Sequence, residues 1–331
     1  MTLHYGLSSR VPRTKEGQLI ASQSDLALFK QNRRFWFLST YLGLTPKESP
    51  VYGPLQLGSR LHDALERSYG YGHDLVESYN EIAQEELRSL EESKVVFDVR
   101  AWQNEAELGR IMLAGFDEWR QETGFDETIE IISAEEKISV PIKLPSGAEV
   151  VLRGKLDVRA KDTHSGMNLV LDWKSTANMS GLIAEAPNSD QLLTYMVLEK
   201  LNGLDDPSFA LQGAKFVMLR KVRRSARAKP PFYDTVEVHH STARLRNYYT
   251  QLLGTLEDYH RTVQMLDSGL DHRLSAYPSA NTRNSWSPFN ALSQVMDDDA
   301  DAERMINDLF VQCSPHERYE EKHSSMLDFI E

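Results

Sequence analysis

The spacing of apolar residues divides the chain into helical and extended stretches. Helical spacing begins at Ser22, with Ser24 as a plausible N-cap, and continues to Leu42. The same spacing predicts further helices over residues 54–69, 75–92, 101–123, 191–201, 241–267 and 305–311. Alternating or continuous apolar runs predict strands in residues 128–144, 151–160, 168–176, 214–219 and 233–238.

The most informative stretch is the hairpin expected in residues 151–176. Its two strands flank residues 161–166, whose polar and glycine-containing composition turns the chain. Because strand side chains alternate between faces, Asp172 and Lys174 share one face, and Asp157 on the facing strand can reach the same place. Two carboxylates and a lysine gathered there are costly in a core unless a cation joins them.

Composition limits the class of protein. At 331 residues, with 40% hydrophobic and 26% charged residues, the chain can form one large or two modest globular domains. One cysteine excludes an internal disulfide framework, and the absence of a membrane-length apolar run or a secretion signal leads us to expect a cytoplasmic protein without a membrane partner. The net charge of -12 argues against a general nucleic-acid coat protein, but an enzyme can confine positive charge to a groove.

Two basic clusters offer nucleic-acid contacts. Residues 215–229 contain seven basic residues and no acid, which fits either a solvated hairpin loop or a clamp on a phosphate backbone. The candidate DNA contacts there are Arg220, Lys221, Arg223 and Arg224. Arg33 and Arg34 precede aromatic residues 35–37, where core packing with a basic edge is favoured over a base-stacking platform.

Further polar residues lie on predicted helices and strands. His62 lies on the helix that contains Gly58, and Glu66, one turn later, shares its face and could orient the ring. A lone helical histidine is usually structural, so His62 gains weight only from the residues that follow it. Gln191 and Tyr195 also share a helix face, and Glu136 could lie near a metal, although an exposed strand glutamate is the more ordinary interpretation.

This order of features resembles the PD-(D/E)xK nuclease superfamily, and within it the RecB-like branch that includes CRISPR-adaptation nucleases and phage exonucleases. The resemblance spans about residues 22–240 and rests on His62, Asp157, Asp172, Lys174, Gln191 and Tyr195. It implies an α/β (α+β) fold: a restriction-endonuclease-like core of a mixed central β-sheet flanked by helices, with an N-terminal helical region and a helical insertion or lid.

The resemblance also suggests how the chain is divided. The expected segments are a tail or edge strand at 1–20, a helical region carrying His62 at 21–127, the nuclease core at 128–240, a C-terminal helical region at 241–313 and a flexible tail at 314–331.

The implied site is a divalent-metal centre. Asp157 and Asp172, completed by His62 and the main-chain carbonyl of Trp173, would hold Mg²⁺ or Mn²⁺, and the imidazole favours Mn²⁺. Asp157, Asp172 and Lys174 would be catalytic, with Lys174 orienting or deprotonating water or stabilising the pentavalent phosphorus. Gln191 and Tyr195 would contact DNA or position the active-site strand.

The chain departs from its CRISPR-adaptation relatives in the residues that hold an iron-sulfur cluster. The comparable positions are Gln31, Asn284, Ser287 and Ser293. With Cys313 as the single cysteine, we expect no iron-sulfur cluster, and packing by Trp286 and Phe289 in its place.

The implied function is a Mg²⁺- or Mn²⁺-dependent DNA exonuclease of recombination, repair or phage DNA processing. Its partners would be DNA and a single-strand annealing or other recombination protein, and a homo-oligomer encircling DNA is one expected form. The alternatives are a non-catalytic DNA-binding or scaffold protein on a nuclease-like fold, and a site-specific endonuclease, for which the sequence offers no separate recognition domain.

Overall fold

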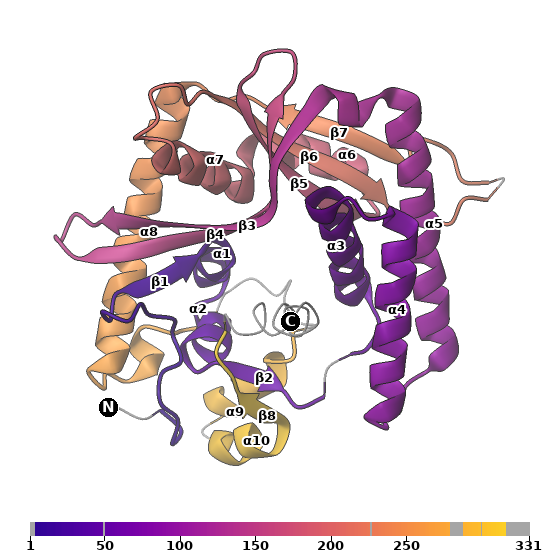
Figure 1. Cartoon of the computed structure of the whole chain (residues 1–331). Coiled ribbons are helices and arrows are strands. Elements are labelled where there is room, and N and C mark those ends of the chain that lie inside the picture. The colour runs from indigo at the N-terminus through magenta and orange to yellow at the C-terminus, as the bar shows by residue number, and fades with distance from the viewer. Residues whose placement is uncertain (1–3, 49, 226, 279–286, 299, 316–331) are drawn as a thin grey trace, which may run out of the picture. The chain divides into compact units, whose positions relative to one another are not determined.

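The computed structural model describes residues 4–48, 50–225, 227–278, 287–298 and 300–315 (Figure 1). The chain forms two compact units, each built from separated segments. Unit 1 comprises Met1–Ser49, Ser139–Arg153 and Asn247–Glu331, and unit 2 comprises Pro50–Ile138 and Gly154–Arg246. The segments expected from the sequence are consecutive, whereas strands β3 and β4 and helix α8 each run through both units.

Unit 2 contains the predicted hairpin and the helix carrying His62. Its helices are α3 (Pro54–Tyr71), α4 (Leu75–Glu92), α5 (Val99–Thr123), α6 (Met179–Glu185) and α7 (Asp190–Asn202). Its strands are parts of β3 (Ile129–Lys143) and β4 (Glu149–Asp162), followed by β5 (Asn168–Thr176), β6 (Leu211–Arg220) and β7 (Tyr233–Val238). Helix α3 begins with a proline in its first turn and ends at Gly72 in the left-handed conformation, two ordinary helix signals.

The strands form a mixed sheet, as the resemblance implied. Strand β4 pairs antiparallel with β5, β5 pairs parallel with β6, β6 pairs antiparallel with β7, and β3 pairs with β4. The β4–β5 register runs from Lys161 opposite Asn168 to Val158 opposite Leu171. Just past that point, the backbone N–H of Trp173 donates 2.8 Å to the carboxylate of Asp157. A side chain thus binds the backbone where the ladder ends, which fixes Asp157 beside β5.

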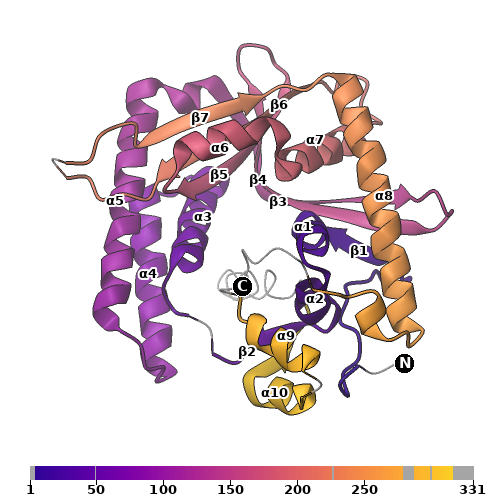
Figure 2. The ribbon, with the colours of Figure 1, turned by 180° about the vertical axis from the view of Figure 1, so that it is seen from behind.

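The two faces of β5 differ in chemistry. Trp173 is buried and meets Phe116 of α5 edge to face, with 5.6 Å between ring centroids. Helices α3, α4 and α5 supply much of this apolar core. Helix α3 packs against β5 and α5 against β6, whereas α4 packs against α3 and α5. The neighbouring Asp172 faces the other way and contacts Gln191 of α7, the helix beside β6 (Figure 2). The predicted alternation of Asp172 and Trp173 is therefore confirmed.

Unit 1 is mainly helical. Its elements are β1 (Leu19–Ser22), α1 (Gln23–Gln31), α2 (Arg33–Trp36), the π-helix Phe37–Tyr41, β2 (Leu44–Pro46), the 3-10 helix His272–Leu274, α9 (Asn290–Asp297), α10 (Ala302–Leu309), β8 (Phe310–Gln312), most of α8 (Thr242–Asp267) and the remaining parts of β3 and β4. Strand β1 pairs parallel with residues 150–153 of β4. Phe35, Trp36 and Phe37 are buried, so core packing, and not base stacking, is confirmed for this aromatic run.

Several element boundaries differ from prediction. The first helix is not continuous to Leu42, because Asn32 adopts extended backbone and caps a new turn through Phe35 N–H. Its N-cap is Ser22 rather than Ser24, since the Ser22 hydroxyl and Asp25 form a capping box. The last helix was placed too late, because it ends at Leu309 and the next three residues pair with β2. Helices α3, α4 and α5 match their predicted ranges closely.

Some expectations cannot be compared. Asn284, Trp286 and residues 316–331 of the expected tail lie outside the described residues. Phe289 is described and stacks on Phe310, with 5.5 Å between ring centroids, which fits its expected packing role. Among the described helices, none combines the length and apolar character needed to cross a membrane.

Candidate metal and catalytic site

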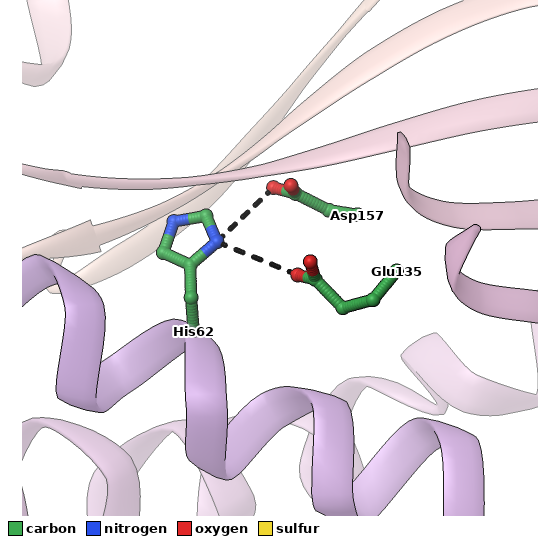
Figure 3. A group of neighbouring side chains, drawn as sticks. All are labelled: His62, Glu135 and Asp157. Carbon is green, nitrogen blue, oxygen red and sulfur yellow. Dashed lines mark ion pairs between the residues drawn. The ribbon is translucent and has the colours of Figure 1, made fainter. Parts of the chain in front are cut away.

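Four elements of unit 2 bring the candidate side chains together. Helix α3 supplies His62, β3 supplies Glu135, β4 supplies Asp157, and β5 supplies Asp172 and Lys174. The His62 Nδ1 atom lies 3.4 Å from Asp157 Oδ2 and 4.0 Å from Glu135 Oε1 (Figure 3). These three residues present ligand atoms that all lie within 4.8 Å of one another.

The electrostatics of His62 and Asp157 are those of an ion pair. Burial opposes protonation of His62, but the hydrogen bond to Asp157 and the charges of Asp157, Asp172 and Glu135 outweigh it and raise the His62 pKa to about 9. Burial acts to raise the pKa of Asp157, yet the hydrogen bond and charge of His62 lower it, assisted by Lys174 and the Trp173 N–H. A metal cation would have to replace the proton that His62 carries.

Asp172 is the most deeply buried carboxylate of the site, with a side chain only 1% exposed. Its Oδ1 accepts a 2.8 Å hydrogen bond from Gln191 Nε2, and its Oδ2 pairs with Lys174 Nζ. Burial, followed by the nearby charge of Asp157, raises the Asp172 pKa to about 6 despite the opposing charge of Lys174. A buried carboxylate held in this way gains from any further positive charge placed beside it.

Helix α7 holds Asp172 from one side. Gln191 also donates 3.1 Å to the Tyr195 hydroxyl, so the two polar residues one turn apart lie on the predicted common face. Tyr195 is buried, and burial raises the pKa of its phenol, so the hydroxyl stays protonated. The chain Tyr195–Gln191–Asp172 fixes the orientation of the carboxylate.

Glu135, not Glu136, is the β3 glutamate that joins the site. Glu136 pairs instead with Arg159, at 2.7 Å, and with the Ser133 hydroxyl. Glu135 has a left-handed backbone, with φ of 53°, which is uncommon for a residue other than glycine. The sequence contained a weak signal, two adjacent acids in a strand, but alternation alone cannot tell which one points inward at an irregular position.

The donor set fits a hard divalent cation. Glu135 and Asp157 supply carboxylate oxygens and His62 supplies an imidazole nitrogen, the ligand types found at Mg²⁺ and Mn²⁺ sites. Asp172, the other predicted carboxylate ligand, is not one of these three converging groups, although its charge acts on His62. Glu135 is only 8% exposed, and burial together with the charge of Asp157 raises its pKa to about 7. Buried carboxylates crowded in this way are stabilised in their ionised forms by a cation.

The side chains of the basic segment, residues 215–229, contact other residues of unit 2. Lys215 is buried in β6 and pairs with Glu237 at 2.9 Å. Arg220 and Lys221 donate to backbone carbonyl oxygens. The remaining two candidates reach α5, Arg223 at Asn104 and Arg224 at Glu118.

Comparison with known proteins gives one family. The sequence profile of the PD-(D/E)XK nuclease superfamily matches residues 20–282. A search of curated protein sequences finds no match. Among solved structures, the chain is similar to a candidate exonuclease from Eubacterium rectale (TM-score 0.43, 12% identity, covering 79% of this chain and 84% of that one). It is also similar to an alkaline exonuclease from Laribacter hongkongensis (TM-score 0.29, 14% identity, covering 64% and 95%).

Proposed function

The chain belongs to the PD-(D/E)XK nuclease superfamily, and we propose that it is a metal-dependent exonuclease that hydrolyses phosphodiester bonds of DNA. One observation carries this proposal: His62, Asp157, Asp172 and Lys174, which are far apart in sequence, meet in one small volume of unit 2. An ordinary surface hairpin with an exposed Asp–Lys pair would not bury Asp172 or bring a helical imidazole to Asp157.

The metal ligands in this proposal are His62, Asp157, Asp172 and the carbonyl of Trp173, with Mg²⁺ or Mn²⁺ as the cation. When bound, such a cation stabilises negative charge on phosphoryl oxygens and makes a nearby water more acidic. Asp157 would be held for this role by the Trp173 N–H, and Asp172 by Gln191. His62 would give up its proton, because only the neutral imidazole can ligate a metal.

Lys174 would act on the attacking water or on the phosphate. Its ammonium pairs with Asp172 and lies 5.4 Å from the centre of the Phe216 ring, so it is confined beside the carboxylates. From there, an ammonium donor can orient a water molecule or stabilise charge on the pentavalent phosphorus, and its free amine could accept a proton. Gln191 and Tyr195 would position Asp172, and they would also contact DNA directly.

The basic segment would bind the phosphate backbone of DNA. Arg220, Lys221, Arg223 and Arg224 are the proposed phosphate contacts, and Arg223 and Arg224 are the more exposed of these. Arg224 is paired with Glu118, so binding DNA would exchange that carboxylate for a phosphate. We infer a role in recombination, repair or phage DNA processing, with a single-strand annealing protein as the expected partner.

The test is digestion of end-labelled linear DNA and of closed circular DNA by the purified protein, with Mg²⁺, Mn²⁺ or EDTA. We expect metal-dependent shortening of the linear DNA only. Asp172→Ala should abolish it, whereas Asp205→Ala, which alters an exposed loop carboxylate, should not. Cutting of the circle would indicate an endonuclease, and no cutting under any condition would favour a DNA-binding or scaffold protein.

A further inference from the structure

The alternation of buried and exposed side chains in β3 shifts where the strand passes the site. Glu130 and Ile132 are exposed before the shift and Lys137 is exposed after it. The exposed side chains therefore move from even-numbered to odd-numbered positions. The buried side chains move in the opposite sense, from odd-numbered Ile129 to even-numbered Ile138. The shift coincides with the left-handed backbone of Glu135. A one-residue shift of this kind is typical of a β-bulge, a device that redirects a side chain and is common beside active sites.

The bulge directs Glu135 toward two different partners. Its Oε1 lies 4.0 Å from His62 Nδ1, the atom that also faces Asp157, and Figure 3 shows both carboxylates converging on that nitrogen. Its Oε2 pairs with Lys155 Nζ. One carboxylate oxygen therefore faces the proposed metal ligands, and the other is held by a lysine two residues before Asp157.

Carboxylates are crowded around the site. Asp157 lies near both Glu135 and Asp172, and Lys155, the partner of Glu135, also lies near Glu66 and Asp63. The ordinary interpretation of Glu135 is that it only balances Lys155, but that role does not require a strained backbone or an oxygen directed at His62.

We propose that Glu135 is an additional ligand of the divalent cation, alongside His62 and Asp157, and that Lys155 competes with the cation for this carboxylate. The ligand set of the site then has one more carboxylate than the superfamily resemblance implied. Such a site takes a hard cation of the Mg²⁺ or Mn²⁺ class, because each added carboxylate oxygen favours hard ions. This role presupposes the metal-dependent site of the proposed function.

The experiment is calorimetric titration of Mn²⁺ into the full-length, EDTA-treated protein without DNA, so that binding is read independently of cleavage. Glu135→Gln should weaken the Mn²⁺ Kd by at least about tenfold, because removal even of a group that only supports a metal ligand commonly costs that much. Glu130→Gln removes the same charge from an exposed position of the same strand and should change Kd less than twofold. Equal, small effects of the two variants would overturn the role of Glu135.

Lys155→Met gives an independent readout if Glu135→Gln does not fold. Freeing Glu135 from its ammonium partner should tighten Mn²⁺ binding about threefold or more, whereas unchanged or weaker binding would overturn the proposal. Asp157→Asn separates this inference from the function on which it rests. Loss of binding in Asp157→Asn with normal binding in Glu135→Gln rejects only the added ligand, whereas a wild-type protein that binds no Mn²⁺ rejects both.

Discussion

Replacing Asp172 by asparagine should stabilise the metal-free protein while destroying its function. Asparagine has the shape of the protonated carboxyl group and can still accept the hydrogen bond from Gln191. It removes a negative charge that burial and Asp157 make unfavourable in the folded state. A catalytic carboxylate that costs stability until its cation binds is an expected consequence of building a metal site inside a protein.

The magnitude follows from the pKa of Asp172. A rise from 3.8 to about 6 means that ionised Asp172 costs the folded state about 3 kcal/mol, at 1.36 kcal/mol per pKa unit. The attraction of Lys174 is already contained in this pKa. The asparagine amide, unlike a protonated carboxyl group, turns N–H donors toward the Lys174 ammonium, so we expect a net increase of about 1–2 kcal/mol in the free energy of unfolding.

The effect should depend on pH in one direction. Because the pKa is higher in the folded than in the unfolded state, Asp172 binds its proton more tightly in the folded protein, and its contribution to wild-type stability falls as pH rises from about 4 to 6. The advantage of Asp172→Asn should therefore be small at pH 4 and complete above about pH 7. Urea unfolding at pH 4 and pH 8 in EDTA measures both limits.

Saturating Mn²⁺ should reverse the order of stability. A cation at 100 times its Kd adds about 2.7 kcal/mol to the wild-type protein, and Asp172→Asn, having lost a ligand, should gain much less. Asp205→Asn, in an exposed loop, should stay within about 0.5 kcal/mol of wild type in both conditions. If Asp172→Asn were less stable than wild type at pH 8 in EDTA, the Lys174 pair would outweigh the burial of charge, and the reasoning would be wrong.

Three further outcomes are expected. Lys174→Met should lower the cleavage rate by about 10²–10⁴-fold without weakening Mn²⁺ binding, measured by calorimetry, because it frees Asp172 from its ammonium partner; loss of binding would show that Lys174 organises the ligands instead. Gly109→Ala should cost about 1–3 kcal/mol in urea unfolding, because its Cβ would lie 2.0 Å from the Tyr79 hydroxyl oxygen, whereas Gly254→Ala, with open space around it, should not destabilise the protein. Arg224→Ala should weaken DNA binding and reduce the salt dependence of log Kd by about one, and an unchanged slope in fluorescence anisotropy would remove Arg224 from the DNA-contact set.

The sequence by itself determined the elements and most of the candidate site. Apolar spacing predicted α3, α4 and α5 because one face of each helix packs in the core, and that pattern is written locally in the chain. Alternation placed Asp172 and Trp173 on opposite faces of β5, and the order of motifs linked His62 to Asp157 across the intervening helices.

Only the tertiary structure decided how these groups meet. No local pattern could show that Glu135 faces His62 and Lys155, because these partners lie on other elements. The β2–β8 pair was missed for the same reason, whereas the break at Asn32 rests on a local cap, in which its side chain accepts from the Phe35 N–H. The type of a side chain and the apolar spacing around it can be read from the sequence. Its charge state and direction depend on atoms that the fold brings close.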